Sequence, residues 1–445
     1  ALNCTDTYTN TILNYLTMIK DNSSKTFCIL PWIHVATFPD GSTPLCCVAR
    51  TPDREEINLN KLTIPAVVNS DYFKQTRVDM LNGKKPSACQ HCFKEEENGA
   101  TSYRTNQNIE WTDKLGEELI KDIVSKTEED GTIPFNLYSL DLRLGNTCNL
   151  KCIMCQPQDS SKWIKDNEFL AENTVLGTDV AGAKTVFRDK VKYYNRDNYE
   201  WYKKTEFINA VLDQSKFLNH IIIAGGEPLF IKEQKDLILN LVKSGDAKNI
   251  SISYHTNGTI YDSELIELWA EFKHVNLYFS LDSYKEINRY LRYPSMFDLI
   301  QTNLQKFDMN CPINVDMDIL TTVSNMSLFY IPEFMKWVSD QNFTRITYKD
   351  STDYGPGWVF SGVVHYPEFL NPKVLPLKVK KAITFKVLRH IDEYKDTIIF
   401  DNLKAFVDMM NSEDLSFRLP ELKEYLENLD KLRKTDYKET FEELI

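Results

Sequence analysis

The sequence lacks any long hydrophobic run. No apolar stretch approaches the ~20 residues that a helix needs to cross a bilayer. The first residues, Ala1-Leu2-Asn3-Cys4, also lack the basic and apolar segments of a secretory signal. We therefore expect a cytoplasmic protein, in which thiols stay reduced. In that setting the 10 cysteines favour metal sites over disulfides.

Positive charge is also scarce. Lys and Arg number 52 against 64 Asp and Glu, which gives a formal net charge of −12. Because broad binding to phosphate backbones relies on clustered Lys and Arg, bulk nucleic-acid binding is not expected. We also find no internal repeat and no low-complexity tract. What the sequence does offer is length, since 445 residues can form two or three domains around a large core.

The sequence pattern changes twice along the chain, and we predict domains at residues 1–134, 135–350 and 351–445. The first region has few periodic segments, so we expect a small, loop-rich domain stapled by metal. Its cysteines are Cys4, Cys28, Cys46, Cys47, Cys89 and Cys92. A helix is predicted over Lys114–Thr132, ending at Gly131. The last region is expected to be mostly helical packing scaffold, with an amphipathic stripe at Leu422, Tyr425, Leu426 and Leu429.

In the middle region, short β-rich runs alternate with amphipathic helical stretches, which is typical of an α/β fold with a parallel sheet. The predicted strands are 139–144, 220–224, 249–254, 275–280, 314–320 and 345–348. The predicted helices between them include 232–244, 263–272, 297–307 and 328–340. Six such units would form an open or partial barrel. The long connection over 156–219 is predicted to add a helical layer packed by its aromatic residues.

Three cysteines follow the first predicted strand in the spacing C-x3-C-x2-C: Cys148, Cys152 and Cys155. The carboxyl end of a parallel barrel strand is where such folds place active sites. An iron–sulfur cubane is normally held by four thiolates, so three would leave one iron open to a small molecule. Zinc is the alternative, but it prefers four Cys or His ligands, and no His lies near this triplet. The pattern favours an iron–sulfur site.

This arrangement resembles the radical S-adenosylmethionine (SAM) enzymes, which place C-x3-C-x2-C after the first strand of a partial TIM-like barrel. Gly225, Gly226 and Glu227 resemble the family's GGEP motif, which binds the amino group of SAM. Glycines permit close backbone approach, and a carboxylate accepts from an ammonium. Read alone, Gly-Gly-Glu-Pro would indicate only a turn.

The resemblance implies further SAM contacts near the ends of later strands. The implied residues are Asn257, Ser280, Asp282 and Arg292, with Met154 where the family often has an aromatic residue beside the adenine. Arg289 is the alternative to Arg292, and Asn325 is a weaker candidate on the fifth strand. The implied chemistry is reductive cleavage of SAM by a [4Fe–4S] cluster on the triplet, which yields a 5′-deoxyadenosyl radical that abstracts hydrogen from a substrate C–H. The electron donor would be of the flavodoxin or ferredoxin type.

A second cysteine set lies in the N-terminal region. A C-x2-C pair, Cys89 and Cys92, follows Cys28 and Cys46, and Cys47 is the alternative to Cys46. Composition alone leaves zinc and iron–sulfur open. The set resembles the twitch/SPASM modules of radical SAM enzymes, which implies an auxiliary [4Fe–4S] cluster, although such modules usually follow the barrel.

These resemblances imply a radical SAM enzyme, an oxidoreductase or a peptide-modifying one, and we expect its substrate to be a peptide or protein side chain. The alternative is a dehydrogenase or epimerase of a sugar or nucleoside. A non-catalytic interaction protein stapled by zinc or a cluster is the third possibility. We recognise neither a winged-helix module that would bind a leader peptide nor a cobalamin-binding domain.

Overall fold

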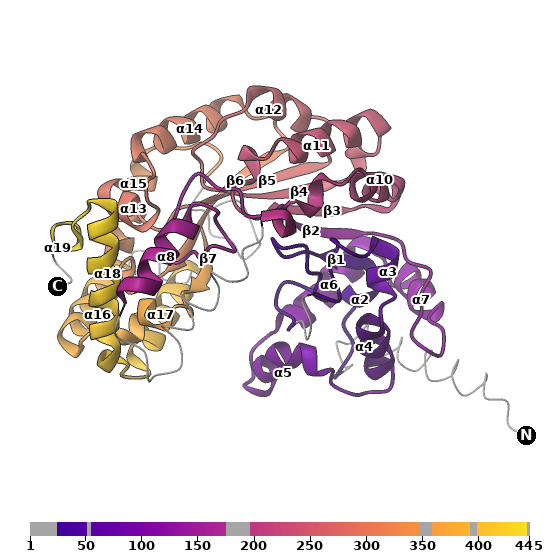
Figure 1. Cartoon of the computed structure of the whole chain (residues 1–445), viewed down its shortest axis with the longest axis horizontal. Coiled ribbons are helices and arrows are strands. Elements are labelled where there is room, and N and C mark those ends of the chain that lie inside the picture. The colour runs from indigo at the N-terminus through magenta and orange to yellow at the C-terminus, as the bar shows by residue number, and fades with distance from the viewer. Residues whose placement is uncertain (1–24, 51–54, 175–195, 347–357, 392–397, 443–445) are drawn as a thin grey trace, which may run out of the picture. The chain divides into compact units, whose positions relative to one another are not determined.

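The computed structural model describes residues 25–50, 55–174, 196–346, 358–391 and 398–442 (Figure 1). Its strands are β1 His34–Ala36, β2 Ser139–Arg143, β3 His220–Ala224, β4 Ser251–Thr256, β5 His274–Ser280, β6 Val315–Val323 and β7 Trp358–Val363. They form one seven-stranded sheet in chain order. The pairs β1–β2, β4–β5, β5–β6 and β6–β7 are parallel. The predicted α/β class with a parallel, partial-barrel sheet is confirmed.

The chain divides into two compact units. The first comprises the described residues up to Gly145 together with Asp197–Ile223 and Asn240–Ile250. Its helices are α2 Leu30–Ile33, α3 Ile64–Val68, α4 Asp71–Leu81, α5 Gln90–Glu97, α6 Tyr103–Leu115, α7 Glu117–Ser125 and α10 Thr205–Asp213. Short 3-10 turns are η1 Ser87–Cys89, η2 Arg196–Lys203, η3 Ser215–Phe217 and η5 Ala247–Asn249.

The second unit comprises the described parts of Asn146–Arg196, Ala224–Leu239 and Ser251–Ile445. Its helices are α8 Trp163–Asn173, α12 Ser263–Trp269, α13 Lys285–Leu291, α14 Phe297–Asn310, α15 Ile331–Asp340, α16 Leu377–Ile391, α17 Ile398–Asn411, α18 Leu419–Arg433 and α19 Tyr437–Thr440. Its 3-10 turns are η4 Pro228–Phe230, η6 Leu328–Tyr330, η7 Glu368–Leu370, η8 Pro372–Val374 and η10 Ser416–Arg418. Helix α11, Lys232–Ser244, contributes residues to both units.

The core of the second unit lies between its strands and the helices beside them. Strand β5 alternates buried and half-buried residues along its whole length, as a sheet with one packed face requires. Helices α12 and α14 lie along the same side of β5 and β6 (Figure 1). The rings of Trp269, Phe279 and Phe307 pack together there. This packing fixes the carboxyl ends of the strands that carry the candidate site.

In the first unit, the predicted helix over Lys114–Thr132 is wrong in both bounds. Gly116 has a positive φ of 80°, which ends α6 and separates it from α7. Helix α7 ends at Ser125, before the turn that Gly131 closes with its N–H to Glu128 O. A Cβ at Gly131 would lie 2.3 Å from the carbonyl oxygen of Lys74, so only glycine fits there.

Other predicted elements are close to those observed. The strands expected from residues 139, 220, 249, 275 and 314 correspond to β2 through β6. The strand expected over 345–348 lies partly outside the described residues, and Arg345 and Ile346 are not in a strand. Strands β1 and β7 were not predicted. The connection 156–219 holds α8, η2 and α10, with 175–195 outside the described part.

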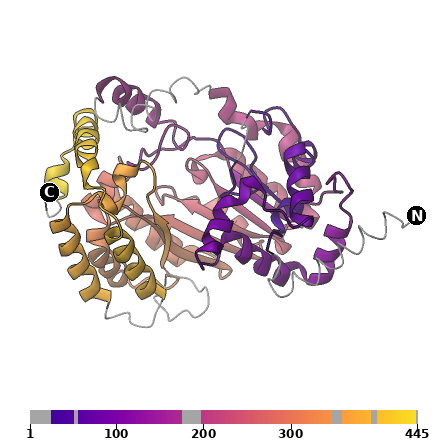
Figure 2. The ribbon, with the colours of Figure 1, turned by 90° about the horizontal axis from the view of Figure 1, so that it is seen from below.

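The C-terminal region is helical, as predicted. Helices α16 and α17 pack side by side and appear in orange in Figure 2. Helix α18 begins with Pro420 in its first turn and buries the stripe Leu422, Tyr425, Leu426 and Leu429. No helix in the described ranges is both long and apolar enough to span a bilayer.

Candidate active site

The C-x3-C-x2-C loop in the second unit is held by its own backbone. The N–H of Lys151 donates to the Tyr293 carbonyl at 2.6 Å, and the N–H of Ile153 donates to the Leu291 carbonyl at 2.8 Å. Two alternate peptide groups of the loop are therefore tied to the end of α13 and to the residues that follow it. The loop has a fixed path, and its cysteines project from a rigid base.

The three thiols of this loop are shielded from water. Cys148 is 9% exposed and Cys152 6% exposed, while Cys155 is partly buried. Burial raises the pKa of Cys148 to about 12, even though the Leu150 N–H donates to its sulfur at 3.4 Å. The thiols of Cys152 and Cys155 share a hydrogen bond, which lowers the pKa of Cys152 and raises that of Cys155.

These three thiols are soft ligands of the kind that an iron–sulfur cluster takes. In the described part of the chain, no group of three or more His, Cys, Asp or Glu side chains converges on one metal-ion position. A cubane would bind each of these thiolates through a different iron. Buried thiols become thiolates when cationic iron offsets the cost of their charge.

The Gly-Gly-Glu turn after β3 packs directly on the cysteine loop. The Glu227 N–H donates to the Thr147 carbonyl at 2.8 Å. A Cβ on Gly226 would lie 2.1 Å from that same carbonyl oxygen, which no side chain allows. Gly225 has a φ of 108°, in the region that favours glycine. Gly226 is thus required by the close approach of two loops, and Gly225 is favoured by its backbone conformation.

The carboxylate of Glu227 is 1% exposed and connects the ends of β3 and β4. It accepts from the Asn257 N–H at 2.7 Å, the Thr256 hydroxyl at 2.8 Å and the Leu229 N–H at 3.1 Å. Burial raises the pKa of Glu227 to about 7, against these three hydrogen bonds. Its charge also acts on the thiol of Cys148.

Asn257 joins the cysteine loop through a closed set of amide and hydroxyl bonds. Its Nδ2 donates to Asn149 Oδ1 at 2.9 Å, and Asn149 Nδ2 donates to the Thr259 hydroxyl at 2.7 Å. The Thr259 hydroxyl donates back to Asn257 Oδ1 at 2.6 Å. Sequence reasoning missed Asn149 and Thr259, although each lies within two residues of a predicted site residue.

Asp282 and Arg292 form a buried ion pair after β5. Arg292 donates through Nε to Oδ2 at 2.7 Å and through Nη2 to Oδ1 at 2.9 Å. The charge of Arg292 acts on the thiols of Cys152 and Cys155, so it lies near the loop. Ser280 ends β5, and both it and Met154 of the loop are partly buried.

Two other sequence candidates are used elsewhere. Arg289 is an exposed partner of Glu286 at 3.3 Å. Asn325 is fully buried and donates to the Phe369 carbonyl at 2.8 Å. The structure therefore brings Arg292, but not Arg289, into the surroundings of the cysteine loop.

Residues 142–311 match the sequence profile of the Radical SAM superfamily. The chain contains a radical SAM domain. No curated protein sequence matches the chain significantly.

Three solved structures are among those that match the chain. Native anSMEcpe with bound AdoMet is 19% identical with a TM-score of 0.35, over 57% of this chain and 62% of that one. SuiB of Streptococcus suis bound to precursor peptide SuiA is 14% identical with a TM-score of 0.33, over 76% of this chain and 66% of that one. TYW1 with a lysine-pyruvate adduct bound is 15% identical with a TM-score of 0.30, over 57% of this chain and 73% of that one. The match spans about three fifths of the anSMEcpe chain.

The second cysteine set lies in the first unit, outside the residues that match the radical SAM profile. Cys28, Cys46 and Cys92 are buried, and Cys89 is partly buried. Burial is the main cause that raises the pKa of each, to about 12 for Cys89. Each of these thiols also lies close enough to feel the charge of at least one other. The four predicted ligands are thus neighbours.

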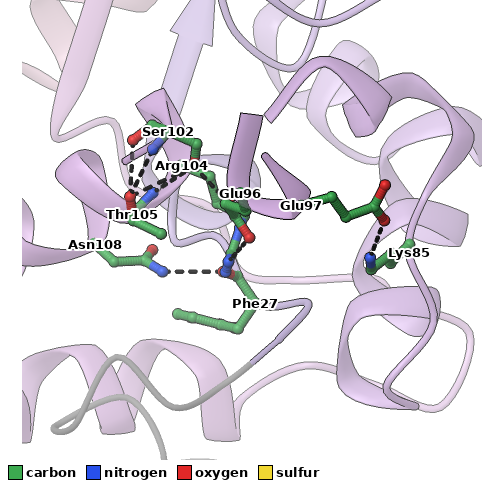
Figure 3. Close-up of polar contacts among 8 residues, drawn as sticks. All are labelled: Phe27, Lys85, Glu96, Glu97, Ser102, Arg104, Thr105 and Asn108. Carbon is green, nitrogen blue, oxygen red and sulfur yellow. Dashed lines mark hydrogen bonds and ion pairs between the residues drawn. The ribbon is translucent and has the colours of Figure 1, made fainter. Parts of the chain in front are cut away.

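Arg104 of α6 ties the segments that carry Cys28 and Cys92 together (Figure 3). Its guanidinium is bonded to Glu96 of α5 at 2.6 and 2.9 Å and to the Phe27 carbonyl at 2.6 Å. Its backbone N–H also hydrogen-bonds the thiol of Cys92. Arg104 therefore links the segments that carry two of the four cysteines.

Cys46 and Cys47 have different surroundings. The charges of Cys28, Cys47 and Cys92 act on Cys46. The thiol of Cys47 hydrogen-bonds the side chain of Tyr103, and the charges of Asp141 and Arg143 act on it. Cys46 alone is near the other three cysteines of the predicted set.

Proposed function

We propose that this chain is a radical SAM enzyme that cleaves SAM reductively at the loop of Cys148, Cys152 and Cys155. The observation that carries the proposal is this buried triplet within a radical SAM domain, braced by the Glu227 turn. The [4Fe–4S] cluster and SAM would together supply a 5′-deoxyadenosyl radical able to abstract hydrogen from a C–H bond. The residues of the chain would bind and orient SAM and the substrate, and they would exclude water.

Two charged residues have hydrogen-bonding capacity left for the amino acid part of SAM. An ionised carboxylate has about four acceptor positions, and Glu227 uses three of its own. An arginine has five N–H donors, and Asp282 takes two of those on Arg292. We assign the ammonium to Glu227 and the carboxylate to Arg292, with Asp282 holding Arg292 in place.

The remaining proposed contacts surround these two. The backbone of Gly225 and Gly226 would lie against SAM, and Asn257 and Ser280 would offer polar groups. Met154 would pack beside the adenine, because a thioether makes favourable contact with an aromatic face. In this proposal, Asn149 and Thr259 hold Asn257 in the orientation that it needs.

We further propose that Cys28, Cys46, Cys89 and Cys92 hold an auxiliary [4Fe–4S] cluster in the first unit. Their mutual proximity, burial and the charge of Arg104 beside Cys28 and Cys89 support a cluster with four thiolates. Zinc on the same four residues is the alternative. A four-thiolate cluster would carry an electron from the substrate or stabilise the unit. The auxiliary set also supports our preference for a peptide or protein side chain as substrate.

Anaerobic reconstitution tests the first proposal. The wild-type chain should bind about eight irons and form 5′-deoxyadenosine from SAM with dithionite. Replacing Cys148, Cys152 and Cys155 together by Ala should leave about four irons and abolish 5′-deoxyadenosine. A colourless protein that contains zinc and no iron would contradict the enzyme proposal in favour of an interaction protein.

The substrate class can be tested with a peptide extract, used before and after protease treatment. We expect a peptide extract to raise 5′-deoxyadenosine formation above the uncoupled rate, and protease treatment of the extract to remove that increase. An increase that survives protease would favour the sugar or nucleoside alternative. The triple Cys→Ala variant serves as the control, since no extract should stimulate it.

A further inference from the structure

Helix α18, more than one hundred residues beyond the radical SAM profile, contacts the cysteine loop directly. The Tyr425 hydroxyl donates to the Ile153 carbonyl at 2.7 Å. Tyr425 is 2% exposed and Ile153 fully buried, so water cannot replace this bond. The acceptor lies between Cys152 and Cys155. Tyr425 thus fixes the turn that carries two of the three proposed ligands.

A buried charge cluster forms the second contact between α18 and the loop. Asp166 of α8 accepts from Lys151 Nζ at 2.7 Å and from Arg433 Nε at 3.0 Å. The side chains of Asp166 and Arg433 are both 2% exposed. Helices α8 and α18 pack side by side (Figure 1). With two cations and one anion, this cluster carries one net positive charge.

Arg433 also packs on the two aromatic residues that support the loop. Its guanidinium lies 4.8 Å from the Trp163 ring centre and 5.1 Å from that of Tyr293. Trp163 donates its indole N–H to the Cys152 carbonyl at 2.8 Å, and the Tyr293 carbonyl accepts from Lys151. Arg433 Nη2 is buried and has no hydrogen-bond partner within the described ranges. The positive charge of Arg433 is therefore only partly neutralised beside Trp163 and Tyr293.

We propose that Tyr425 and Arg433 are positioning residues of the SAM-cleaving centre: Tyr425 fixes the geometry of the Cys152–Cys155 turn, and Arg433 places a buried positive charge beside it. The inference rests on the proposed function. A cluster on three thiolates gains negative charge when it is reduced, and a nearby cation in a low-dielectric site favours that state. Helix α18 is on this view part of the reaction centre and more than packing scaffold.

Arg433→Gln tests the charge. We expect about a tenfold lower ratio of reduced to oxidised cluster at a fixed applied potential, equivalent to about 59 mV for one electron. Arg433→Lys keeps the charge and should retain the wild-type ratio. Lys423→Gln removes one exposed charge from the same helix and should change nothing. The measurement is a redox titration of the protein that holds only the triplet cluster, with Cys28, Cys46, Cys89 and Cys92 replaced by Ala.

Tyr425→Phe tests the geometry, because it removes one hydroxyl and keeps the ring and the charge. We expect an unchanged ratio of reduced to oxidised cluster, an altered EPR spectrum with SAM bound, and about tenfold faster loss of iron to a chelator. Leu422→Ala is the control, since it removes buried apolar contact from the same helix. Neither the EPR spectrum nor the rate of iron loss should change in this variant.

Different outcomes would contradict the proposed function and the proposed roles of Tyr425 and Arg433. A wild-type chain that binds no triplet iron and forms no 5′-deoxyadenosine overturns the proposed function itself. A competent wild type with equal potentials in wild type, Arg433→Gln and Arg433→Lys overturns the charge role. Equal iron loss and spectra in Tyr425→Phe and wild type overturn the geometric role, even if Arg433→Gln does not fold.

Discussion

Arg292 holds both carboxylate oxygens of Asp282, at 2.7 and 2.9 Å, in a pair whose aspartate side chain is fully buried. The Thr322 N–H also donates to Asp282 Oδ1, at 3.0 Å. Asp282 is therefore committed to protein partners and links β5, β6 and Arg292. Its role in the proposed site is to aim the Arg292 guanidinium. Asp282 and Arg292, which the sequence pattern gave equally as SAM contacts, therefore have different roles.

The first prediction concerns this pair. Asp282→Asn should lower the free energy of unfolding by about 3 kcal/mol, because it leaves the buried Arg292 without its counter-charge. It should also raise the KM for SAM. Arg289→Gln alters an exposed pair and should change stability by less than about 0.5 kcal/mol. Denaturant titration of both variants makes the comparison, and equal effects would show that the buried pair has no special role.

The second prediction concerns pH and Glu227. Its pKa is about 7 in the folded chain against 4.5 for the ordinary side chain, so the folded state binds its proton more tightly. The stabilisation is complete below pH 4.5 and is lost as the pH rises to 7, a decrease of about 3 kcal/mol. Glu227→Gln should remove this part of the pH dependence from urea unfolding of the metal-free protein. A difference between wild type and variant that stays constant from pH 4.5 to 7.5 would contradict the burial argument.

The third prediction uses the contact between Gly226 and Thr147. Gly226→Ala should cost about 1–3 kcal/mol and displace the cysteine loop, because the new methyl would overlap the Thr147 carbonyl. Iron bound at the triplet should fall with it. Gly245→Ala is the control: it has a φ of +82° but no atom within 4 Å of the added methyl, so it strains the backbone alone. If both variants keep their iron, the loop contact does not determine cluster binding.

The fourth prediction separates Cys46 from Cys47. Cys46→Ala should reduce bound iron from about eight to about four atoms per chain, because it removes one of four clustered thiolates. Cys47→Ala should leave the iron content unchanged, since its thiol contacts Tyr103. Iron and zinc analysis of both proteins measures this. The reverse result would move the ligand assignment to Cys47.

Features that depend on local sequence were predicted well. Strand β5 was found because its residues alternate, and the cysteine triplet because its three cysteines lie within eight positions. Strand β1 was missed because His34, Val35 and Ala36 are all buried and show no alternation. Strand β7 is disguised by Gly362, which has a φ of 115° next to a register shift in its pairing with β6.

Contacts between distant segments could not be predicted in this way. Asn149 meets Thr259 across 110 positions, and Tyr425 meets Ile153 across 272. A hydrophobic stripe explained Tyr425 fully as a buried helix residue, so nothing in the pattern set its hydroxyl apart. Hydrogen bonds at such separations depend on the completed fold, and the residue types alone are compatible with many partners.

The separation between Ile153 and Tyr425 also sets an order of events during synthesis. At ~5–20 residues per second, the 272 positions between them take roughly 14 to 54 s to translate. Throughout that interval the cysteine loop exists without the helix that will fix its central turn. Iron delivered then would meet an unfinished site, whereas iron delivered after release of the chain meets a braced one. If this loop holds the proposed cluster, we expect the insertion of that cluster to follow the synthesis of α18.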